Sequence, residues 1–280
     1  MQEINLGEKR VNTMKLSAYD HVMLARDCKR PNIRDYIEEL FTDFVELKGD
    51  RLGMEDASIL GGIALFEGKP VTVIGHVKGH NLVENAAVNF GMPQPEGYRK
   101  ALRLMKQAEK FHRPVITIVD TPGAYPGIEA ESNGQSIAIA NNLAKMSRLK
   151  TPIICVITGE GSSGGALALA VADRVYMLEH AVYNVLSPEG FATILWKDSK
   201  KCKDAAKVMG MTADELFKDG LIDGILKETP EGVQVDKSIT IAAFKEMLQR
   251  ELSELCGLKT EELLKRRFEK YRRKGLDGRD

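Results

Sequence analysis

A glycine-rich loop in the middle of the chain has the residue types to hold a negatively charged oxygen. The apolar run 153–157 precedes it, four glycines lie within 159–165, and the Ala-rich segment 166–172 follows. This order predicts a strand, a loop and a helix. Glycine lets a ligand approach the main chain, and the first amides of a helix have no internal acceptor. We therefore expect an oxyanion site built by the main-chain amides of Gly164, Gly165 and Ala166.

The same loop allows two other interpretations. Residues 161–165 match G-x-S-x-G, which would make Ser163 the nucleophile of a hydrolase. That nucleophile needs a base, and no histidine lies in a pattern tied to Ser163; the chain has His21, His76, His80, His112 and His180. Alternatively, the glycines only let a helix pack closely on a strand. The loop alone leaves all three interpretations open.

The elements around the loop repeat one unit. Strands led by Pro70, Pro114 and Pro152 are each followed by a glycine loop and a helix, which predicts βα units and a largely parallel sheet. The loops 75–79, 123–127 and 159–165 would then share the carboxyl edge of the sheet, where ligands bind in such folds. This shared edge favours a binding site over simple packing.

The second loop has two interpretations of its own. The amides of Gly123 and Ala124 could line the same site, or the prolines and glycines of 122–127 could only set a rigid turn. Both stay open.

Periodicity predicts the other elements. Residues 61–66 and 70–75 read as a hairpin and 174–178 as a further strand. Helices are expected at 15–27, 35–44, 97–111, 129–147, 205–209, 212–218, 239–256 and 260–274. In the last helix, arginines interleave with glutamates, so we expect a solvated or subunit-facing surface at Arg266, Arg267, Arg272 and Arg273.

Composition narrows the function classes. The 280 residues carry 40 Lys and Arg against 40 Asp and Glu, which gives no net charge to attract nucleic acid or an anionic membrane. Four separated cysteines form no C-x-x-C pair, so we expect reduced thiols, a cytoplasmic protein and no metal site in this chain. We find no apolar leader and no run long enough to span a bilayer.

Several segments together resemble a known family, the α subunits of bacterial acetyl-coenzyme A carboxylase carboxyltransferase. The resemblance runs from about Leu24 to Arg267. It rests on 120–127 (DTPGAYPG), 159–166 (GEGSSGGA), 183–190, 89–93, 95–105 and 195–197. So many matches in order make the resemblance specific.

The resemblance implies an α/β fold of the crotonase type, a spiral of ββα units with flanking helices. It implies a division into an N-terminal arm at 1–23, a carboxyltransferase domain at 24–256 and a charged C-terminal helix at 257–280. It also implies partners: a zinc-ribbon β subunit in a heterotetramer, a biotin carboxyl carrier protein and a biotin carboxylase.

The implied reaction transfers the carboxyl group from carboxybiotin on the carrier to acetyl-coenzyme A, giving malonyl-coenzyme A for fatty acid synthesis. In the family, the glycines matching Gly164 and Gly165 face the ureido oxygen of biotin, and the β subunit holds the acetyl thioester. Such chemistry needs fixed dipoles and alignment instead of a side-chain base. Two alternatives remain: a self-sufficient acyl-coenzyme A hydratase or isomerase, and a non-catalytic scaffold.

The sequence departs from the family in three places. His80 stands where relatives usually carry Arg or Lys, so an anion contact there would be weaker and pH-dependent. The segment before Leu24 is shorter than in many members. Ser162 often corresponds to glycine.

Overall fold

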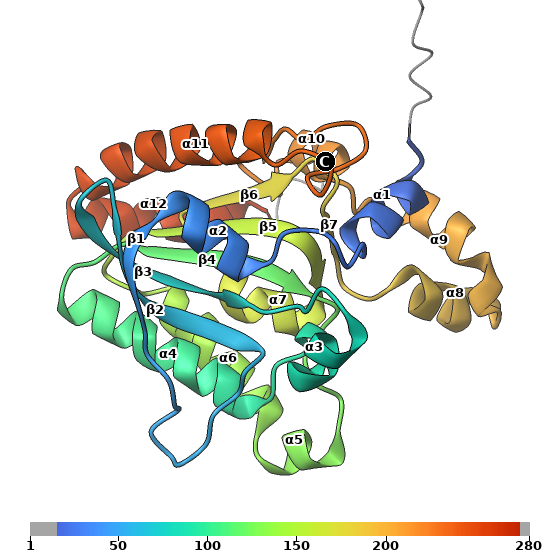
Figure 1. Cartoon of the computed structure of the whole chain (residues 1–280), viewed down its shortest axis with the longest axis horizontal. Coiled ribbons are helices and arrows are strands. Elements are labelled where there is room, and N and C mark those ends of the chain that lie inside the picture. The colour runs from blue at the N-terminus through green and yellow to red at the C-terminus, as the bar shows by residue number, and fades with distance from the viewer. Residues whose placement is uncertain (1–15, 275–280) are drawn as a thin grey trace, which may run out of the picture.

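The computed structural model describes residues 16–274 of the chain, and 1–15 of the expected arm lie outside that range. The described part contains a sheet of eight strands (Figure 1). These are β1 (Thr42–Glu46), β2 (Ile59–Phe66), β3 (Lys69–His76), β4 (Val115–Thr121), β5 (Ile153–Ser162), β6 (Arg174–Leu178), β7 (Val182–Asn184) and β8 (Gly224–Leu226). The strand order is β1-β2-β3-β4-β5-β6-β8, and β7 pairs with the end of β5.

The sheet is mixed, as the sequence predicted. β1, β2 and β3 pair antiparallel, whereas β3, β4, β5, β6 and β8 run parallel. β4 and β5 are buried along their whole length because helices cover both faces of the sheet. The carboxyl ends of β3, β4 and β5 therefore lie side by side at one edge.

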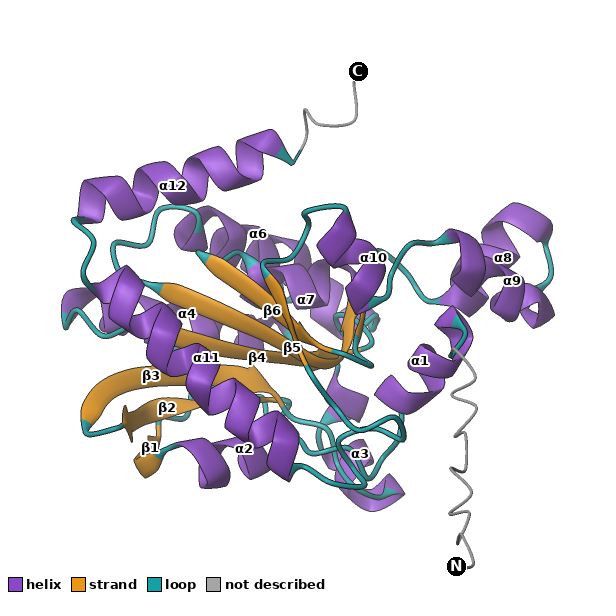
Figure 2. Cartoon of the chain, turned by 90° about the horizontal axis from the view of Figure 1, so that it is seen from above, coloured by secondary structure: helices purple, strands orange, loops and turns teal. Residues whose placement is uncertain are grey.

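Helices cover the sheet on two sides and extend it at one end (Figure 2). One face carries α4 (Pro95–Lys110), α6 (Gln135–Met146) and α7 (Ser163–Ala170), and the other carries α2 (Ile33–Leu40) and α11 (Ser238–Cys256). The remaining helices are α1 (Ala18–Ala25), α3 (Leu82–Ala87), α5 (Ile128–Ser132), α8 (Pro188–Trp196), α9 (Cys202–Val208), α10 (Ala213–Lys218) and α12 (Thr260–Arg273). α8 and α9 project from one end in both views.

The helix predicted at 35–44 is wrong at its C-terminal end. α2 ends at Leu40, Phe41 is extended, and β1 begins at Thr42. Phe44 packs against Gly62 of β2, where a Cβ atom would meet the Phe44 ring at 2.8 Å. Pairing with the edge of the sheet outweighs the helical spacing of the apolar residues.

Two further predictions change in detail. The helix predicted at 129–147 is interrupted between α5 and α6, where Gly134 adopts φ +85°. The first part of the predicted loop 159–165 belongs to β5, which runs on to Ser162. Gly159 and Gly161 are strand residues that leave room for the Asp120 carboxylate and the Tyr183 ring. These two glycines serve close packing, but against side chains of neighbouring strands and not against a helix as the packing interpretation had it.

The C-terminal helix is anchored by a side chain that the sequence assigned to a solvated or subunit-facing surface. Arg267 is only 1% exposed and forms two hydrogen bonds to Asp173, of 2.8 and 2.6 Å. Its other donors reach the carbonyls of Met146, Leu149 and Thr151. Charge periodicity could not reveal this, because the acceptors lie far away in sequence.

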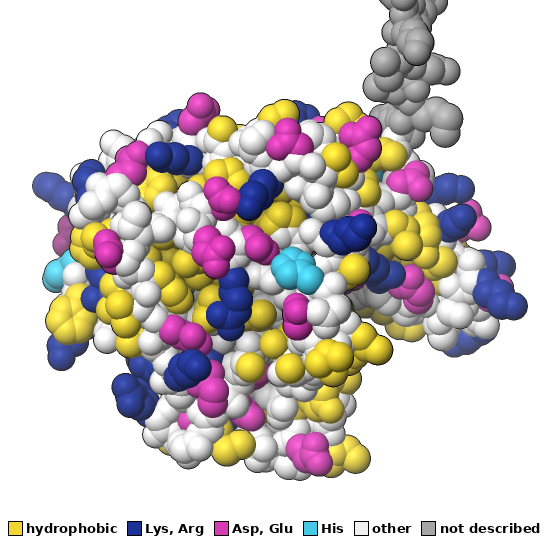
Figure 3. Space-filling view, in the orientation of Figure 1, with side chains coloured by type: hydrophobic (Ala, Val, Ile, Leu, Met, Phe, Trp, Pro, Cys, Tyr) yellow, Lys and Arg dark blue, Asp and Glu magenta, His cyan; other side chains and the backbone are white. Residues whose placement is uncertain are grey.

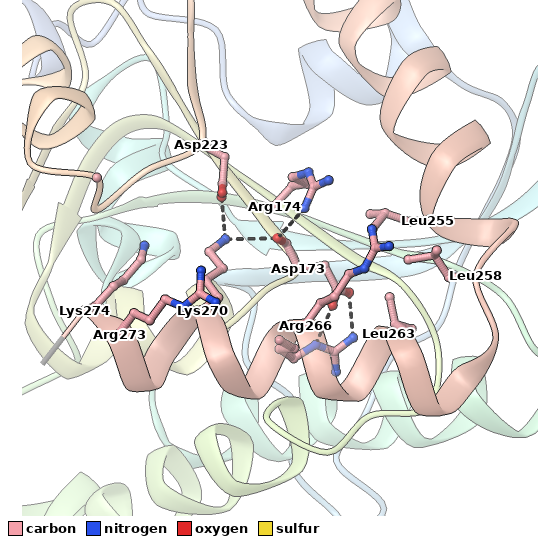
Figure 4. Close-up of a pocket in the computed structure, with 12 residues that line it drawn as sticks. Asp173, Arg174, Asp223, Leu255, Leu258, Leu263, Arg266, Lys270, Arg273 and Lys274 are labelled. Carbon is pink, nitrogen blue, oxygen red and sulfur yellow. Dashed lines mark hydrogen bonds and ion pairs between the residues drawn. The ribbon is translucent and has the colours of Figure 1, made fainter. Parts of the chain in front are cut away.

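Around Arg267, α12 lines a hollow of about 310 Å³ with several charged side chains (Figure 4). Lys270 lies between Asp223 and the Asp173 carbonyl, and Arg174 bonds Glu251 and Glu254. Lys270 and Arg174 already have acceptors within the chain. We therefore interpret the hollow as the place where α12 packs against the sheet, not as a ligand site.

Candidate active site

The carboxyl edge of the sheet brings three charged residues together. Lys78 follows β3, Asp120 lies near the end of β4, and Glu160 lies near the end of β5. The Lys78 Nζ is 2.7 Å from Asp120 Oδ1 and 2.9 Å from Glu160 Oε2. Asp120 Oδ1 also accepts the Glu160 N–H at 2.9 Å. This contact holds the end of β5 against the end of β4.

Two further residues extend this cluster. Arg26, the C-cap of α1, donates from Nε to Glu160 Oε1 at 2.8 Å. Its terminal nitrogens reach both oxygens of Glu189, in the first turn of α8, at 2.8 and 3.2 Å. A signal in the sequence was available but not used: Lys78, Asp120 and Glu160 each end one of three predicted parallel strands.

Lys78 and Glu160 are charged at neutral pH. Burial by itself lowers the pKa of Lys78, but Asp120 and Glu160 outweigh burial and hold that pKa above its ordinary value. Burial by itself raises the pKa of Glu160, but Lys78 and Arg26 outweigh it, so the net pKa is lowered. Both oxygens of Glu160 are thus neutralised by cations.

The start of α7 leaves main-chain donors free. The N-cap residue, Ser162, makes no side-chain cap, and its hydroxyl donates instead to Asn184 Oδ1 at 2.8 Å. Among residues 16–274, no acceptor outside the helix receives a hydrogen bond from the Gly164 or Gly165 amide. Helix geometry pairs the Ala166 amide with the Ser162 carbonyl, and Ala166 is fully buried.

The structure brings the second glycine loop against the first. A Cβ atom on Gly165 would lie 2.5 Å from the Ala124 nitrogen and 2.6 Å from the Gly123 carbonyl carbon. Gly123 has φ +145°, and the Thr121 hydroxyl accepts its N–H at 3.0 Å and donates to its carbonyl at 2.7 Å. Gly164 is more open, since its Cβ would meet only Ile139, at 3.7 Å.

A cleft of about 670 Å³ begins at Ser163 and Gly164 and runs along α7. One wall is the outer face of α7, and the other is formed by β7, the start of α8 and α10. Its lining is mostly apolar and includes Leu167, Val171, Tyr183, Leu186, Phe191 and Leu216. An aliphatic ligand in this cleft would have the free amide of Gly164 at its mouth.

Ser163 is strained but lacks a base. It is exposed and has φ +57°, a conformation that turns the chain sharply from β5 into α7. Within 16–274, no histidine forms a hydrogen bond with it: His21 and His180 contact each other at 3.2 Å, His76 is buried and His80 contacts other residues. The hydrolase interpretation therefore has no support in the geometry.

His76 is a buried group that the sequence analysis did not use. It ends β3 and is fully buried, and in the described part of the chain its ring nitrogens have no hydrogen-bond partner. Burial, and then the nearby Lys78, lower the pKa of His76 to about 3. The imidazole is therefore neutral beside the cluster.

His80 contacts groups at and near the start of α2. Its Nδ1 is 2.9 Å from the Cys28 carbonyl, and its Nε2 is 3.0 Å from Asn32 Nδ2 and 3.3 Å from Asp35 Oδ2. None of these partners belongs to the glycine loop at 159–165.

Apolar side chains are exposed beside the cleft. Figure 3 shows hydrophobic side chains over α3 and near α5, next to the notch that separates them from α8. Ile128 is 86% exposed, and Leu82, Val83, Ile194 and Leu195 are also exposed. Apolar surface of this kind is typical of a protein interface.

Within 16–274, no group of three or more His, Cys, Asp or Glu is arranged to hold a metal ion. No helix in that range is long and apolar enough to cross a membrane. The four cysteines are free thiols.

The sequence matches the family described as acetyl co-enzyme A carboxylase carboxyltransferase-like over residues 2–275. A relative from Halalkalibacterium halodurans, named acetyl-coenzyme A carboxylase carboxyl transferase subunit alpha, is 51% identical over 279 residues, 98% of this chain and 86% of the relative. A relative of the same name from Clostridium acetobutylicum is 53% identical over 264 residues, 94% of this chain and 96% of the relative.

Solved structures share the fold. A transcarboxylase 12S structure aligns with a TM-score of 0.68 at 19% identity, covering 85% of this chain and 44% of that one. A Pseudomonas malonate decarboxylase hetero-tetramer in complex with coenzyme A aligns with a TM-score of 0.63 at 22% identity, covering 76% of this chain and 84% of that one. These similarities confirm the crotonase-type α/β fold that the resemblance implied.

Proposed function

This chain belongs to the acetyl co-enzyme A carboxylase carboxyltransferase-like family, and we propose that it is the α subunit of that enzyme. The subunit would act in transferring the carboxyl group of carboxybiotin to acetyl-coenzyme A, which gives malonyl-coenzyme A. The observation that carries the site assignment is the free amide of Gly164, which lines an apolar cleft, followed by the free amide of its buried neighbour Gly165.

The residues present fit biotin. Biotin is apolar except for its ureido group and the end of its side chain, and the cleft combines an apolar lining with the main-chain donor of Gly164, next to that of Gly165. When bound, carboxybiotin supplies the carboxyl group, and negative charge remains on its ureido oxygen. The amides of Gly164 and Gly165 would hold that charge, each contributing about 3–4 kcal/mol to the barrier reduction.

Other residues of the chain would support these two donors. Gly123 and Ala124 contact Gly165 and hold its main chain in place. Arg26 and Lys78 neutralise Glu160, whose free carboxylate would otherwise repel an anion at the start of α7. The apolar walls would exclude water, which strengthens the interaction between amide and anion. None of these residues needs to act as a base.

The proposed partners follow from the family and from the exposed surface. The relatives are named subunit alpha, so we propose a β subunit that covers the apolar rim beside the cleft and binds acetyl-coenzyme A. Biotin carboxyl carrier protein and biotin carboxylase would complete the complex in the cytoplasm. The arm, domain and C-terminal helix boundaries at residues 23 and 256 stay predictions.

Glycine substitutions test this function in the complex with the β subunit. We would measure the reverse reaction, in which malonyl-coenzyme A and free biotin give acetyl-coenzyme A and carboxybiotin. Gly164→Leu should lower kcat/KM by about 100-fold, because its side chain enters the cleft beside the amides. Gly257→Leu, at an exposed helix end, should stay within twofold.

Two results would contradict the proposal. Full activity of Gly164→Leu, in a complex that still assembles, would mean that the chain is a scaffold. Hydration of crotonyl-coenzyme A by the purified chain alone would favour the hydratase, although the Asp120 and Glu160 carboxylates are already paired with Lys78.

A further inference from the structure

The two walls of the cleft belong to different parts of the chain. One wall is α7, which carries Gly164, and the other includes Tyr183 of β7 and Phe191 of α8. Between them, the Ser162 hydroxyl donates to Asn184 at the mouth. A second connection runs behind the mouth, through Arg26.

Arg26 joins the end of β5, which leads into α7, to the first turn of α8 with one guanidinium group. Its Nε bonds Glu160, four residues before Gly164, and its two terminal nitrogens bond Glu189, two residues before Phe191. The partners lie 134 and 163 residues away in sequence. Because the guanidinium is planar and its donors point in fixed directions, it sets the distance and angle between the two carboxylates.

The helix that carries Arg26 is itself held in place. Val22 and Ala25 of α1 pack with Val182 and Met211 in a small apolar cluster. A capping box between Ser17 and Asp20 begins the helix. Arg26 is therefore presented from a fixed element, and its side chain is 29% exposed.

We propose that Arg26 is a positioning residue that fixes the α8 wall relative to the Gly164 and Gly165 amides. This inference rests on the proposed function. Without the bridge, the α8 wall would be free to move away from α7, and a bound ring would no longer be aligned with the amides. Misalignment at this point lowers kcat, because the amides act on charge that develops in the transition state.

The chain offers a matched control for the bridge. Arg174 also bonds two glutamates, Glu251 at 2.8 Å and Glu254 at 2.9 Å, and its side chain is 24% exposed. It lies at the amino end of β6, at the opposite edge of the sheet from the Gly164 and Gly165 amides, and it does not itself line the cleft. Loss of two partly exposed ion pairs should therefore cost Arg26→Met and Arg174→Met a similar shift in melting temperature.

The reverse reaction in the complex separates the two arginines. We expect Arg26→Met to lower kcat by about tenfold with a smaller change in KM for free biotin, and Arg174→Met to stay within twofold of the wild type. Arg26→Lys should resemble Arg26→Met, because an ammonium keeps the charge but cannot reproduce the bridge. Wild-type activity of Arg26→Lys would overturn the proposal and leave charge neutralisation of Glu160 as the role of Arg26.

The other end of the bridge gives a second measurement. Glu189→Gln should lower kcat about as much as Arg26→Met, and the double variant should be no worse than either single variant. Wild-type activity of Glu189→Gln would overturn the proposal that the bridge through Arg26 positions α8. If Gly164→Leu abolishes transfer while Arg26→Met behaves like Arg174→Met, only this inference fails; if Gly164→Leu is fully active, the proposed function fails.

Discussion

The two edges of the sheet each hold buried ion pairs, yet only one edge is suited to chemistry. At the amino edge, Arg267 and Asp173 are fully enclosed, and the remaining donors of Arg267 end on carbonyls. At the carboxyl edge, Lys78 bridges Asp120 and Glu160 beside two amides with no acceptor outside their helix. A buried ion pair alone therefore does not mark a site. What distinguishes the candidate site is the presence of free main-chain donors next to an apolar cleft.

The largest effect on stability should come from the amino edge. Arg267→Met would leave Asp173 buried without its partner, which should lower the free energy of unfolding by about 3–5 kcal/mol. Arg266→Met, one residue away and 49% exposed, should cost less than about 1 kcal/mol. Urea unfolding of both variants measures the difference. Equal losses of stability in the two variants would mean that the buried Arg267–Asp173 pair stabilises the fold no more than an exposed arginine does.

At the carboxyl edge, neighbouring glycines should respond differently to the same substitution. Gly165→Ala places a Cβ atom 2.5 Å from the Ala124 nitrogen, so it should cost about 1–3 kcal/mol of stability and reduce carboxyl transfer. Gly164→Ala, whose Cβ meets only Ile139 at 3.7 Å, should cost less stability. Unfolding and transfer assays on the pair test this. An equally stable Gly165→Ala would argue against close contact of the two loops.

The acid side of the stability curve should depend on His76. Its folded-state pKa is lowered to about 3 by burial and Lys78, so between pH 6.5 and 3 the unfolded state binds a proton that the folded state does not. Stability from this source is present above pH 6.5 and is lost as the pH falls toward 3. When the pH falls from 7 to 5, the free energy of unfolding of His76→Phe should decrease by about 2 kcal/mol less than that of the wild type.

Urea unfolding at the two pH values measures that loss. His112→Asn, at an exposed position, is the control and should change nothing in the pH dependence. If the stability of His76→Phe depends on pH as that of the wild type does, His76 is not the source of the pH dependence.

The smallest effect should come from the strained serine. Ser163→Gly relieves φ +57° and should raise the free energy of unfolding by about 1 kcal/mol, with transfer activity within twofold. Glu67→Gly, at φ +48° in the β2–β3 turn, should give a similar gain away from the site. Thermal unfolding of both variants checks the gain. A large loss of activity in Ser163→Gly alone would assign the hydroxyl a role that we do not give it.

The expected elements show why sequence patterns succeed in some places and fail in others. The hairpin, the central strands and α7 were predicted because apolar runs and glycines act over a few residues. Phe44 was wrongly predicted as helical because pairing of its segment with β2 decides its secondary structure. The burial of Arg267 was missed because its acceptors lie 94 or more residues away in sequence. For the site, the shared edge of the loops was predicted, but not the cluster formed by Arg26, Lys78 and Glu189.

By itself, the sequence determined the order of strands, glycine loops and helices, and with it the edge at which a ligand would bind. Local periodicity and backbone freedom are properties of short segments, so they can be read without coordinates. Only the tertiary structure decided which glycines pack and which leave donors free, and that Arg26 joins Glu160 to Glu189. Those outcomes depend on burial and on contacts between distant segments, which no local pattern contains.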